Sequence, residues 1–256
     1  MKNILLFSFS ILLLSSCGKI NDEPIDTPEE SPVNWTAAAD SSSQSLANGF
    51  WNSGSSYFNY NNSGNKDFHY WPQAHGLDVL VDAYDRTGNS LYKNEMNQWF
   101  IGVKIKNGYT FYNNFYDDME WNALAMLRAY NSTKDEKFKT ATLDVWANIQ
   151  TGWNSTMDGG IAWKKDQLYY KNTPANAPAC ILAARLYKQF NGTSDLEWAK
   201  KIYSWMKDHL YEAGTGFVYD GINRENTGAK DKWKFTYNQG TFIGAALELY
   251  NITGEK

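Results

Sequence analysis

The sequence is poor in cysteine and histidine, with 2 Cys and 3 His among 256 residues. So few cysteines cannot build the disulfide framework of a small secreted scaffold. The histidines show no zinc-ligand spacing, and the chain has no glycine-rich phosphate-binding loop. These absences exclude a disulfide-stapled scaffold, a zinc enzyme and a nucleotide-binding loop. The sequence implies no cofactor and no metal.

An excess of positive charge is also missing. Lys and Arg together number 24 against 28 Asp and Glu, which gives a formal net charge of -4. Nucleic-acid binding needs a broad basic surface, because neutralised phosphates supply most of the affinity. We therefore expect no nucleic-acid partner.

The longest apolar run lies at the N-terminus and is too short to span a bilayer as a stable anchor. Lys2 precedes the run 4–14, which ends in Leu14-Ser15-Ser16-Cys17-Gly18. This arrangement resembles a bacterial lipobox, in which the cysteine is lipidated and becomes the mature N-terminus. An ordinary secretory signal with an incidental cysteine is the alternative. We expect a lipoprotein signal peptide over 1–17 with lipidation at Cys17.

The following stretch, 18–32, is acidic and contains prolines, which is typical of a flexible tether. These features predict a bacterial outer-membrane lipoprotein that contacts the membrane through its lipid, on the cell surface or the periplasmic face. The other cysteine, Cys180, lies in an apolar run and is expected to be a small buried side chain.

Aromatic residues are abundant, with 11 Trp, 17 Tyr and 13 Phe. Hydrophobic residues make up 43% and charged residues 20%, which is typical of a globular chain with a sizeable core. A core does not need so many indoles. Aromatic rings in clefts suit ligands with flat apolar faces, and a pyranose ring has one.

One motif recurs along the chain: an apolar helix, a tyrosine and then a polar turn. The tyrosines that end the repeats are Tyr84, Tyr130, Tyr187 and Tyr250. After each of the first three turns comes an amphipathic stretch, at 91–104, 136–150 and 196–211. Each unit is therefore predicted to be a helical hairpin with an apolar inner and an amphipathic outer helix.

The repeats predict an all-α domain over 33–256, in which helical hairpins form an (α/α)6 type of toroid; an open solenoid is the alternative. Counting a leading helix at 33–48, about four hairpins are present. The sequence ends where the fourth outer helix should begin, so we expect the toroid to be incomplete. Long loops that return to one end of such a bundle are where sites are usually built.

The strongest candidate for chemistry is the adjacent pair Asp117 and Asp118, where a Tyr-rich loop meets the second inner helix. Glycoside hydrolysis uses two carboxyl groups, one a protonated acid and the other an ionised nucleophile or base. Neighbouring carboxyls in a poorly solvated cleft have pKa values that are pushed apart. Two other interpretations remain open: the aspartates cap the helix, or they bind a cation together with Glu120.

Every inner helix begins with aromatic and amide residues, which would face one mouth if the hairpins form a ring. The residues expected to contact a sugar are Trp71, Asn114, Tyr116, Trp163, Asn176, Tyr237, Asn238 and Gln239. Aromatic rings stack on sugar faces, and amides bond hydroxyl groups. The alternative is that these side chains belong to the core or cap the helices.

Four motifs together carry a family resemblance. They are Tyr116-Asp117-Asp118 with Trp121, the run 159–165 (GGIAWKK), the Asn-x-Pro-x-Asn run at 172–176, and 236–240 (TYNQG). As a set over about 33–256 they resemble glycoside hydrolase family 76, endo-acting α-1,6-mannanases with an (α/α)6 barrel. The last third of that barrel has no counterpart in this sequence.

The resemblance implies retaining hydrolysis of the α-1,6-mannan backbone by a protein expected to be a monomer. It implies Asp117 as the nucleophile and Asp118 as the general acid/base, with α-mannan as the polysaccharide substrate and no cofactor. Two other functions stay open at this point. One is a non-catalytic glycan-binding lipoprotein, and the other is an inverting glycosidase on the same barrel.

Overall fold

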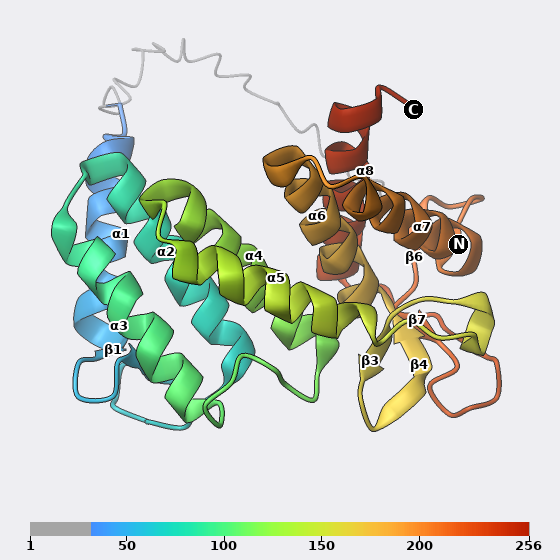
Figure 1. Cartoon of the computed structure of the whole chain (residues 1–256), viewed down its shortest axis with the longest axis horizontal. Coiled ribbons are helices and arrows are strands. Elements are labelled where there is room, and N and C mark those ends of the chain that lie inside the picture. Colours follow the sequence, from blue (N-terminus) through green and yellow to red (C-terminus); the bar gives the residue numbers. More distant parts are fainter. Residues whose placement is uncertain (1–31, 256) are drawn as a thin grey trace, which may run out of the picture. The chain divides into compact units, whose positions relative to one another are not determined.

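The computed structural model describes residues 32–255, and Trp35–Lys256 forms one compact unit. The described residues form eight α-helices joined by loops with short strands (Figure 1). The helices are α1 (Trp35–Phe50), α2 (Tyr70–Thr87), α3 (Ser90–Lys106), α4 (Tyr116–Thr133), α5 (Glu136–Gln150), α6 (Thr173–Phe190), α7 (Thr193–His209) and α8 (Thr236–Thr253). The signal segment with Cys17 and the tether up to residue 31 lie outside the described residues.

The helices alternate between inner and outer positions. The inner helices α2, α4, α6 and α8 pack on one another in chain order, and α3, α5 and α7 pack outside the inner helix that each follows. The outer helix predicted at 136–150 coincides with α5. The outer helices α3 and α7 begin one and three residues before their predicted starts. The prediction of an all-α fold of helical hairpins is confirmed.

All four inner helices end in the same way. The residue after each helix adopts the left-handed conformation, with φ of 65° at Gly88, 57° at Lys134, 58° at Asn191 and 71° at Gly254. The backbone N–H of each of these residues donates to the carbonyl of the repeat tyrosine four positions earlier. This bond satisfies a carbonyl that the helix end would otherwise leave unpaired. The recurring tyrosine therefore marks the end of each inner helix.

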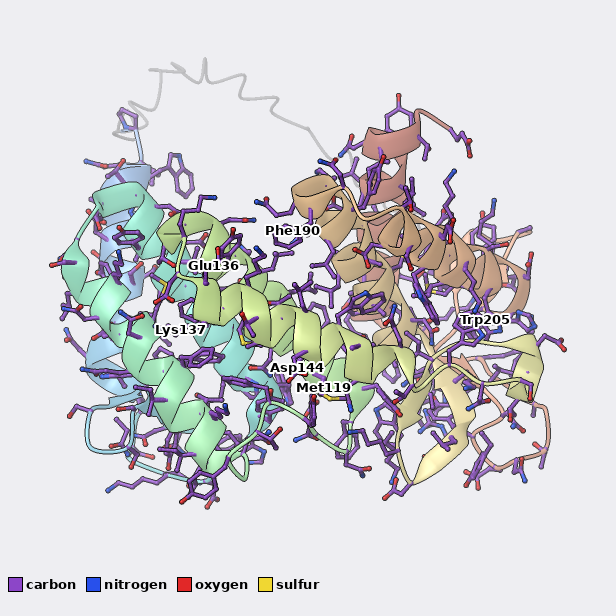
Figure 2. All side chains as sticks on the ribbon, viewed as in Figure 1. Met119, Glu136, Lys137, Asp144, Phe190 and Trp205 are labelled. Carbon is purple, nitrogen blue, oxygen red and sulfur yellow. The ribbon has the colours of Figure 1, made fainter. Side chains whose placement is uncertain are left out.

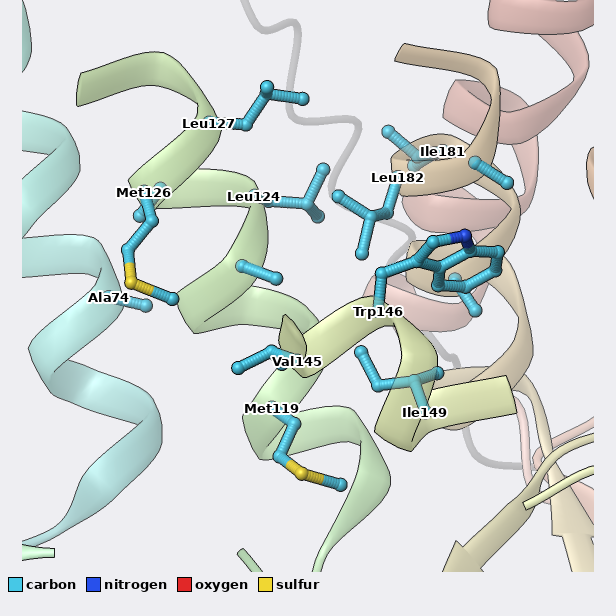
Figure 3. Close-up of a cluster of buried hydrophobic side chains, with 14 of the residues drawn as sticks. Ala74, Met119, Leu124, Met126, Leu127, Val145, Trp146, Ile149, Ile181 and Leu182 are labelled. Carbon is cyan, nitrogen blue, oxygen red and sulfur yellow. The ribbon is translucent and has the colours of Figure 1, made fainter. Parts of the chain in front are cut away.

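The core lies between the inner helices and their outer partners. Figure 3 shows Met119 and Met126 of α4, Val145 and Ile149 of α5, and Leu182 of α6 in this layer, and all five are 0% exposed. Burying such side chains contributes about 1.5–3 kcal/mol each, which fixes α4 between its neighbours. Because α4 carries the aspartates, this packing also fixes their starting point.

The loops between hairpins contain strands that the sequence analysis did not predict. In the described part of the chain these are β1 (Trp51–Asn52), β2 (Tyr57–Phe58), β3 (Ala162–Lys164), β4 (Gln167–Asn172), β5 (Tyr211–Glu212), β6 (Phe217–Val218), β7 (Gly221–Ile222) and β8 (Lys230–Asp231). Four of them form an antiparallel sheet in the order β3-β4-β7-β8. This sheet joins the loop before α6 to the loop before α8.

Polar side chains join the helices on the outside. Lys137 of α5 donates to the amide oxygen of Asn97 on α3 across 2.5 Å, and Trp205 of α7 donates to the carbonyl of Met157 in the loop before β3 across 2.8 Å. Figure 2 labels Lys137 and Trp205. Cys180 of α6 is 0% exposed, as expected. Across residues 32–255, no helix has both the length and the apolar character that a membrane span requires.

Candidate active site

The two aspartates lie in the first turn of α4. Phe115 precedes the helix in an extended conformation, with φ -87° and ψ 125°, and its side chain caps nothing. Oδ1 of Asp117 accepts the backbone N–H of Asp118 across 3.1 Å. An N-terminal turn favours negative charge, because its N–H groups point outward without helical partners. The position of the pair at the helix start therefore favours a negative charge on it.

A tryptophan from the next loop holds Asp117 from the other side. The indole N–H of Trp163 on β3 donates to Oδ2 of Asp117 across 3.2 Å. The β3 hairpin is anchored to the segment before α4, because Lys165 N–H donates to the carbonyl of Asn114 across 2.9 Å. Trp163 also contacts the ring of Phe115 edge to face, with the ring centres 5.2 Å apart. Asp117 thus accepts a hydrogen bond on each of its oxygens.

The two carboxyls have raised but different pKa values. Burial raises the pKa of Asp117 to about 6, against the lowering effect of its hydrogen bonds from Asp118 and Trp163. Burial and the neighbouring charge of Asp117 raise the pKa of Asp118 to about 7. Near neutral pH, Asp117 is accordingly the more readily ionised member and Asp118 the more readily protonated one. Acid–base chemistry on a single bond needs this division.

Two hollows meet at the aspartate pair. One is about 640 Å³ and extends past the start of α2 and the loop at 106–108, and the other is about 400 Å³ and extends towards the start of α8. Both are lined by Trp71, Asp117, Asp118 and Trp163. A chain-like ligand could therefore continue on both sides of the carboxyls.

A further hollow of about 590 Å³ lies between α7 and α8, and it shares no lining residue with these two.

The second hollow contains a carboxylate that the sequence analysis did not select. Asp220 is 4% exposed and lines this hollow with the aspartate pair. Its oxygens accept hydrogen bonds from Tyr170 across 3.0 Å, Arg224 across 2.7 Å and Asn238 across 3.0 Å. The negative charge of Asp220 also raises the pKa of Asp117. Only its place in the long loop before α8 could have indicated it from sequence.

Aromatic rings surround the carboxyls in the second hollow. Besides Trp71 and Trp163, it is lined by Trp121, Tyr170, Trp233, Phe235 and Tyr237. Trp71 remains 50% exposed and Tyr237 51% exposed, so part of each ring is open to a ligand, although one face of Tyr237 stacks on Phe235 with the ring centres 5.0 Å apart. The predicted convergence of the inner-helix starts is therefore present, because Trp71 begins α2, the aspartates begin α4 and Tyr237 begins α8.

Four of the predicted contact residues lie in or beside this site. Trp71, Trp163 and Tyr237 line the hollows, and the hydroxyl of Tyr237 donates to Asp220 across 3.4 Å. Asn238 is 0% exposed and reaches the site through its hydrogen bond to Asp220.

Asn114 and Tyr116 are not brought into either hollow. Asn114 is exposed, and its amide donates to Asp166 across 3.2 Å. Tyr116 is 2% exposed and packs in the core, with its hydroxyl 3.3 Å from that of Thr151. Both residues position the segment that leads to the aspartates.

Asn176 and Gln239 join loops to helix starts. Asn176 is 0% exposed, and its side chain both donates to and accepts from the backbone of Ile161, across 2.9 and 2.8 Å. Gln239 makes the corresponding pair of bonds to the backbone of Val218, across 2.8 and 2.9 Å. These amides therefore hold the strands around the site rather than line it.

No group of three or more His, Cys, Asp or Glu side chains within residues 32–255 is arranged to hold a metal ion. Glu120, which the cation interpretation required, is 0% exposed and lies within the core. It cannot share a solvent-accessible ion with the aspartate pair in this arrangement.

Comparison with known proteins shows a family match over most of the chain. The model of glycosyl hydrolase family 76 matches residues 34–256. The mannan endo-1,6-alpha-mannosidase DCW1 of Candida glabrata is 32% identical over 152 residues, which are 54% of this chain and 34% of that protein. The aligned part of this chain therefore spans about a third of the length of this curated relative.

Solved structures share the fold. An inactive variant of the alpha-1,6-mannanase GH76A of Salegentibacter sp. HEL1_6, with two neighbouring aspartates replaced by alanine, was solved in complex with alpha-1,6-mannotetrose. It is 40% identical with a TM-score of 0.83, and the match covers 87% of this chain and 66% of that one. The Lin0763 protein of Listeria innocua is 43% identical with a TM-score of 0.79 and the same coverage.

Proposed function

The chain belongs to glycosyl hydrolase family 76, and from this we propose that it hydrolyses α-1,6-mannosidic linkages within the backbone of mannan. One observation carries the proposal: two neighbouring carboxyls with pKa values raised to about 6 and about 7 lie where two aromatic-lined hollows meet. The relatives support the choice of substrate. DCW1 is a mannan endo-1,6-alpha-mannosidase, and the Salegentibacter enzyme was solved with alpha-1,6-mannotetrose.

The proposed reaction is a double displacement. The ionised carboxylate of Asp117 attacks the anomeric carbon and forms a glycosyl ester, while the carboxyl of Asp118 gives its proton to the departing oxygen. Asp118, now ionised, takes a proton from water, and the oxygen of that water attacks the anomeric carbon. The ester bond to Asp117 breaks, which restores both carboxyls and releases the sugar with its original anomeric configuration.

The environments of the two aspartates support this assignment of roles. Asp117 accepts hydrogen bonds from Trp163 and from the backbone of Asp118, and both favour its ionised form. Asp118 has the higher pKa, about 7, because it is buried beside Asp117. The inactive Salegentibacter variant also lost two neighbouring aspartates, which supports a joint role for this pair.

Aromatic rings and a third carboxylate would position the sugar. The exposed parts of the Trp71 and Tyr237 rings are suited to stacking on mannose rings. Asp220 accepts two hydrogen bonds on each oxygen, from Tyr170 and Arg224 and from Tyr237 and Asn238, so it would act on the sugar by holding the ring of Tyr237 in place. A hollow on each side of the aspartates suits cleavage inside a polymer better than removal of a terminal residue.

The experiment that tests this function is incubation of the protein with unbranched α-1,6-mannan, followed by sizing of the products. A ladder of oligosaccharides is expected, and release of mannose alone or of nothing would contradict endo-hydrolysis. D117A should abolish the ladder and keep binding of α-1,6-mannotetraose. If D117A releases reducing sugar at the rate of the unchanged protein, the non-catalytic glycan-binding function is the better account.

We further propose that the protein is a monomeric lipoprotein of the bacterial outer membrane, attached through lipidated Cys17. The lipobox-like sequence at 14–18 and the acidic tether at 18–32 support this location, and the acidic tether favours the cell surface. Metabolic labelling with a palmitate analogue should mark the unchanged protein and leave C17A unlabelled. Protease added to whole cells should remove a surface-displayed domain and spare a periplasmic one.

A further inference from the structure

Glu120 is a carboxyl group that the proposed mechanism does not use. It lies on α4, three residues after Asp117, and its side chain is 0% exposed. Neither Oε1 nor Oε2 has a hydrogen-bond partner that meets normal geometry. An ionised carboxylate in such surroundings is strongly disfavoured, so the group takes up a proton instead. The turn of the two aspartates therefore contains a third carboxyl group, which is buried and unpartnered.

The surroundings of Glu120 favour its neutral form. Burial raises its pKa most, and the charges of Asp117 and Asp118 on the same helix raise it further. One group acts in the opposite direction: the backbone N–H of Ala179 on α6, which lies near the carboxyl. No titratable side chain of α2, α5 or β3, which also pack on α4, contributes to this shift.

Ala179 directly follows a proline inside α6. Pro178 lies inside this helix, where its ring cannot donate a hydrogen bond and disturbs the preceding turn. The carboxyl of Glu120 approaches α6 at this point.

A second buried side chain holds the same turn on its other side. Asn122 is 0% exposed, and its amide donates to the carbonyl of Tyr70 at the start of α2 across 3.2 Å. It also donates to the carbonyl of Asp118 across 2.8 Å. The aspartate turn is thus tied to α2 by Asn122, while Glu120 faces α6.

We propose that Glu120 is a positioning residue that works as a neutral carboxylic acid: it holds the turn of Asp117 and Asp118 against α6 without adding a third negative charge to the pair. The catalytic part of this inference rests on the proposed hydrolysis of α-1,6-mannan. An ionised Glu120 would raise the pKa of Asp117 and would oppose the ionisation that its role as nucleophile requires.

Three variants of the full chain test the proposal. Glu120→Gln keeps an uncharged group of the same shape, and Glu120→Ala removes it. Glu95→Gln is the matched control, because Glu95 on α3 is also buried, at 8% exposed, with an unpartnered Oε2, and lines neither hollow at the aspartates.

The first readout is the pH dependence of kcat/KM on α-1,6-mannan. E120Q should stay within about threefold of the unchanged protein, with both limbs of the profile in place, because the amide replaces a neutral acid. E120A should lose about 100-fold in kcat, because the aspartate turn is no longer held in position. E95Q should keep both rate and profile. A profile of E120Q displaced to lower pH would show that a charge had been removed, and would overturn the proposal.

The second readout needs no activity, so it separates this proposal from the proposed function. Above the ordinary pKa of 4.5, Glu120 is ionised in the unfolded chain, and the proposed neutral state keeps it protonated in the folded one. The unfolding equilibrium constant of the unchanged protein relative to E120Q should therefore rise up to tenfold per pH unit above that value. If the ratio of the two unfolding constants does not change between pH 5 and 7, folded Glu120 is not neutral and the proposal is overturned.

Amide hydrogen exchange completes the test. Exchange in the first turn of α4 should be faster in E120A than in E120Q, and equal rates would overturn the positioning role. If the unchanged protein releases no oligosaccharide, the proposed function fails, whereas the unfolding and exchange results still decide the state and role of Glu120.

Discussion

The indole N–H of Trp163 on β3 donates to Oδ2 of Asp117 on α4 across 3.2 Å. A residue from the loop that follows the second hairpin thereby influences the charge of a carboxyl at the start of that hairpin. The link depends on the β3 hairpin, which the bridge between Phe115 and Lys164 holds against the segment before α4. The assignment of roles to the two aspartates rests on contacts of this kind.

Replacing Trp163 by phenylalanine should raise the pKa of Asp117. The indole hydrogen bond lowers that pKa, which is about 6, and phenylalanine has no N–H to donate. The acidic limb of the kcat/KM profile should move upward by about 0.5–1 pH unit. W205F is the control, because Trp205 donates to the carbonyl of Met157, away from the aspartates. An unchanged acidic limb in W163F would show that the hydrogen bond from Trp163 does not lower the pKa of Asp117.

Replacing Asp220 by asparagine should act in the opposite direction. The charge of Asp220 raises the pKa of Asp117, so D220N should lower that pKa and move the acidic limb to lower pH. The rate should also fall by about tenfold or more, because Tyr170 and Arg224 lose a charged acceptor. D231N serves as the control, because Asp231 is the other carboxylate to which Arg224 donates a hydrogen bond. An upward shift in D220N would contradict the electrostatic argument.

Replacing Asp118 by asparagine should stabilise the fold at neutral and alkaline pH. Its pKa is raised from 3.8 to about 7, so the folded protein retains a proton that the unfolded chain has lost. The stability associated with this proton is complete below pH 3.8 and is lost as the pH rises through about 7. Urea unfolding at pH 8 should show a gain of roughly 1–3 kcal/mol in D118N, with no gain at pH 3. Equal stability at both pH values would show that Asp118 is not shifted.

Replacing Gly160 by alanine should destabilise the protein. Gly160 has φ of +79°, and a Cβ there would lie 2.7 Å from the ring of Trp205. Both the left-handed backbone and the collision disfavour alanine, so we expect a loss of roughly 2–4 kcal/mol in free energy of unfolding. G214A is the control, because Gly214 has an ordinary φ and no atom within 4 Å of the added Cβ. A loss no greater than that of G214A would show that the 159–160 turn adapts.

The sequence predicted the hairpins well because each inner helix repeats one local pattern. The tyrosine before each turn supplies the carbonyl that closes the left-handed end at Gly88, Lys134, Asn191 and Gly254. Hydrophobic periodicity and end signals are local properties, so they can be read without knowing the contacts between segments.

The strands and part of the site could not be predicted because they depend on contacts between distant segments. β7 is two residues long and exists through its pairing with β4 and β8. Asp220 meets the aspartate pair only because this sheet brings its loop to the second hollow. For the same reason the sequence did not show that the amides Asn176 and Gln239, expected to bond sugar, also bond the backbone of Ile161 and Val218.

The most direct test of the central claim is the anomeric configuration of the first product formed from unbranched α-1,6-mannan, followed by proton NMR from the start of the reaction. Attack by Asp117 with Asp118 as acid and then base predicts that α-configured reducing ends appear first and β ends arise later by mutarotation. Reducing ends that appear first in the β configuration would show a single displacement by water and would contradict the roles given to both aspartates.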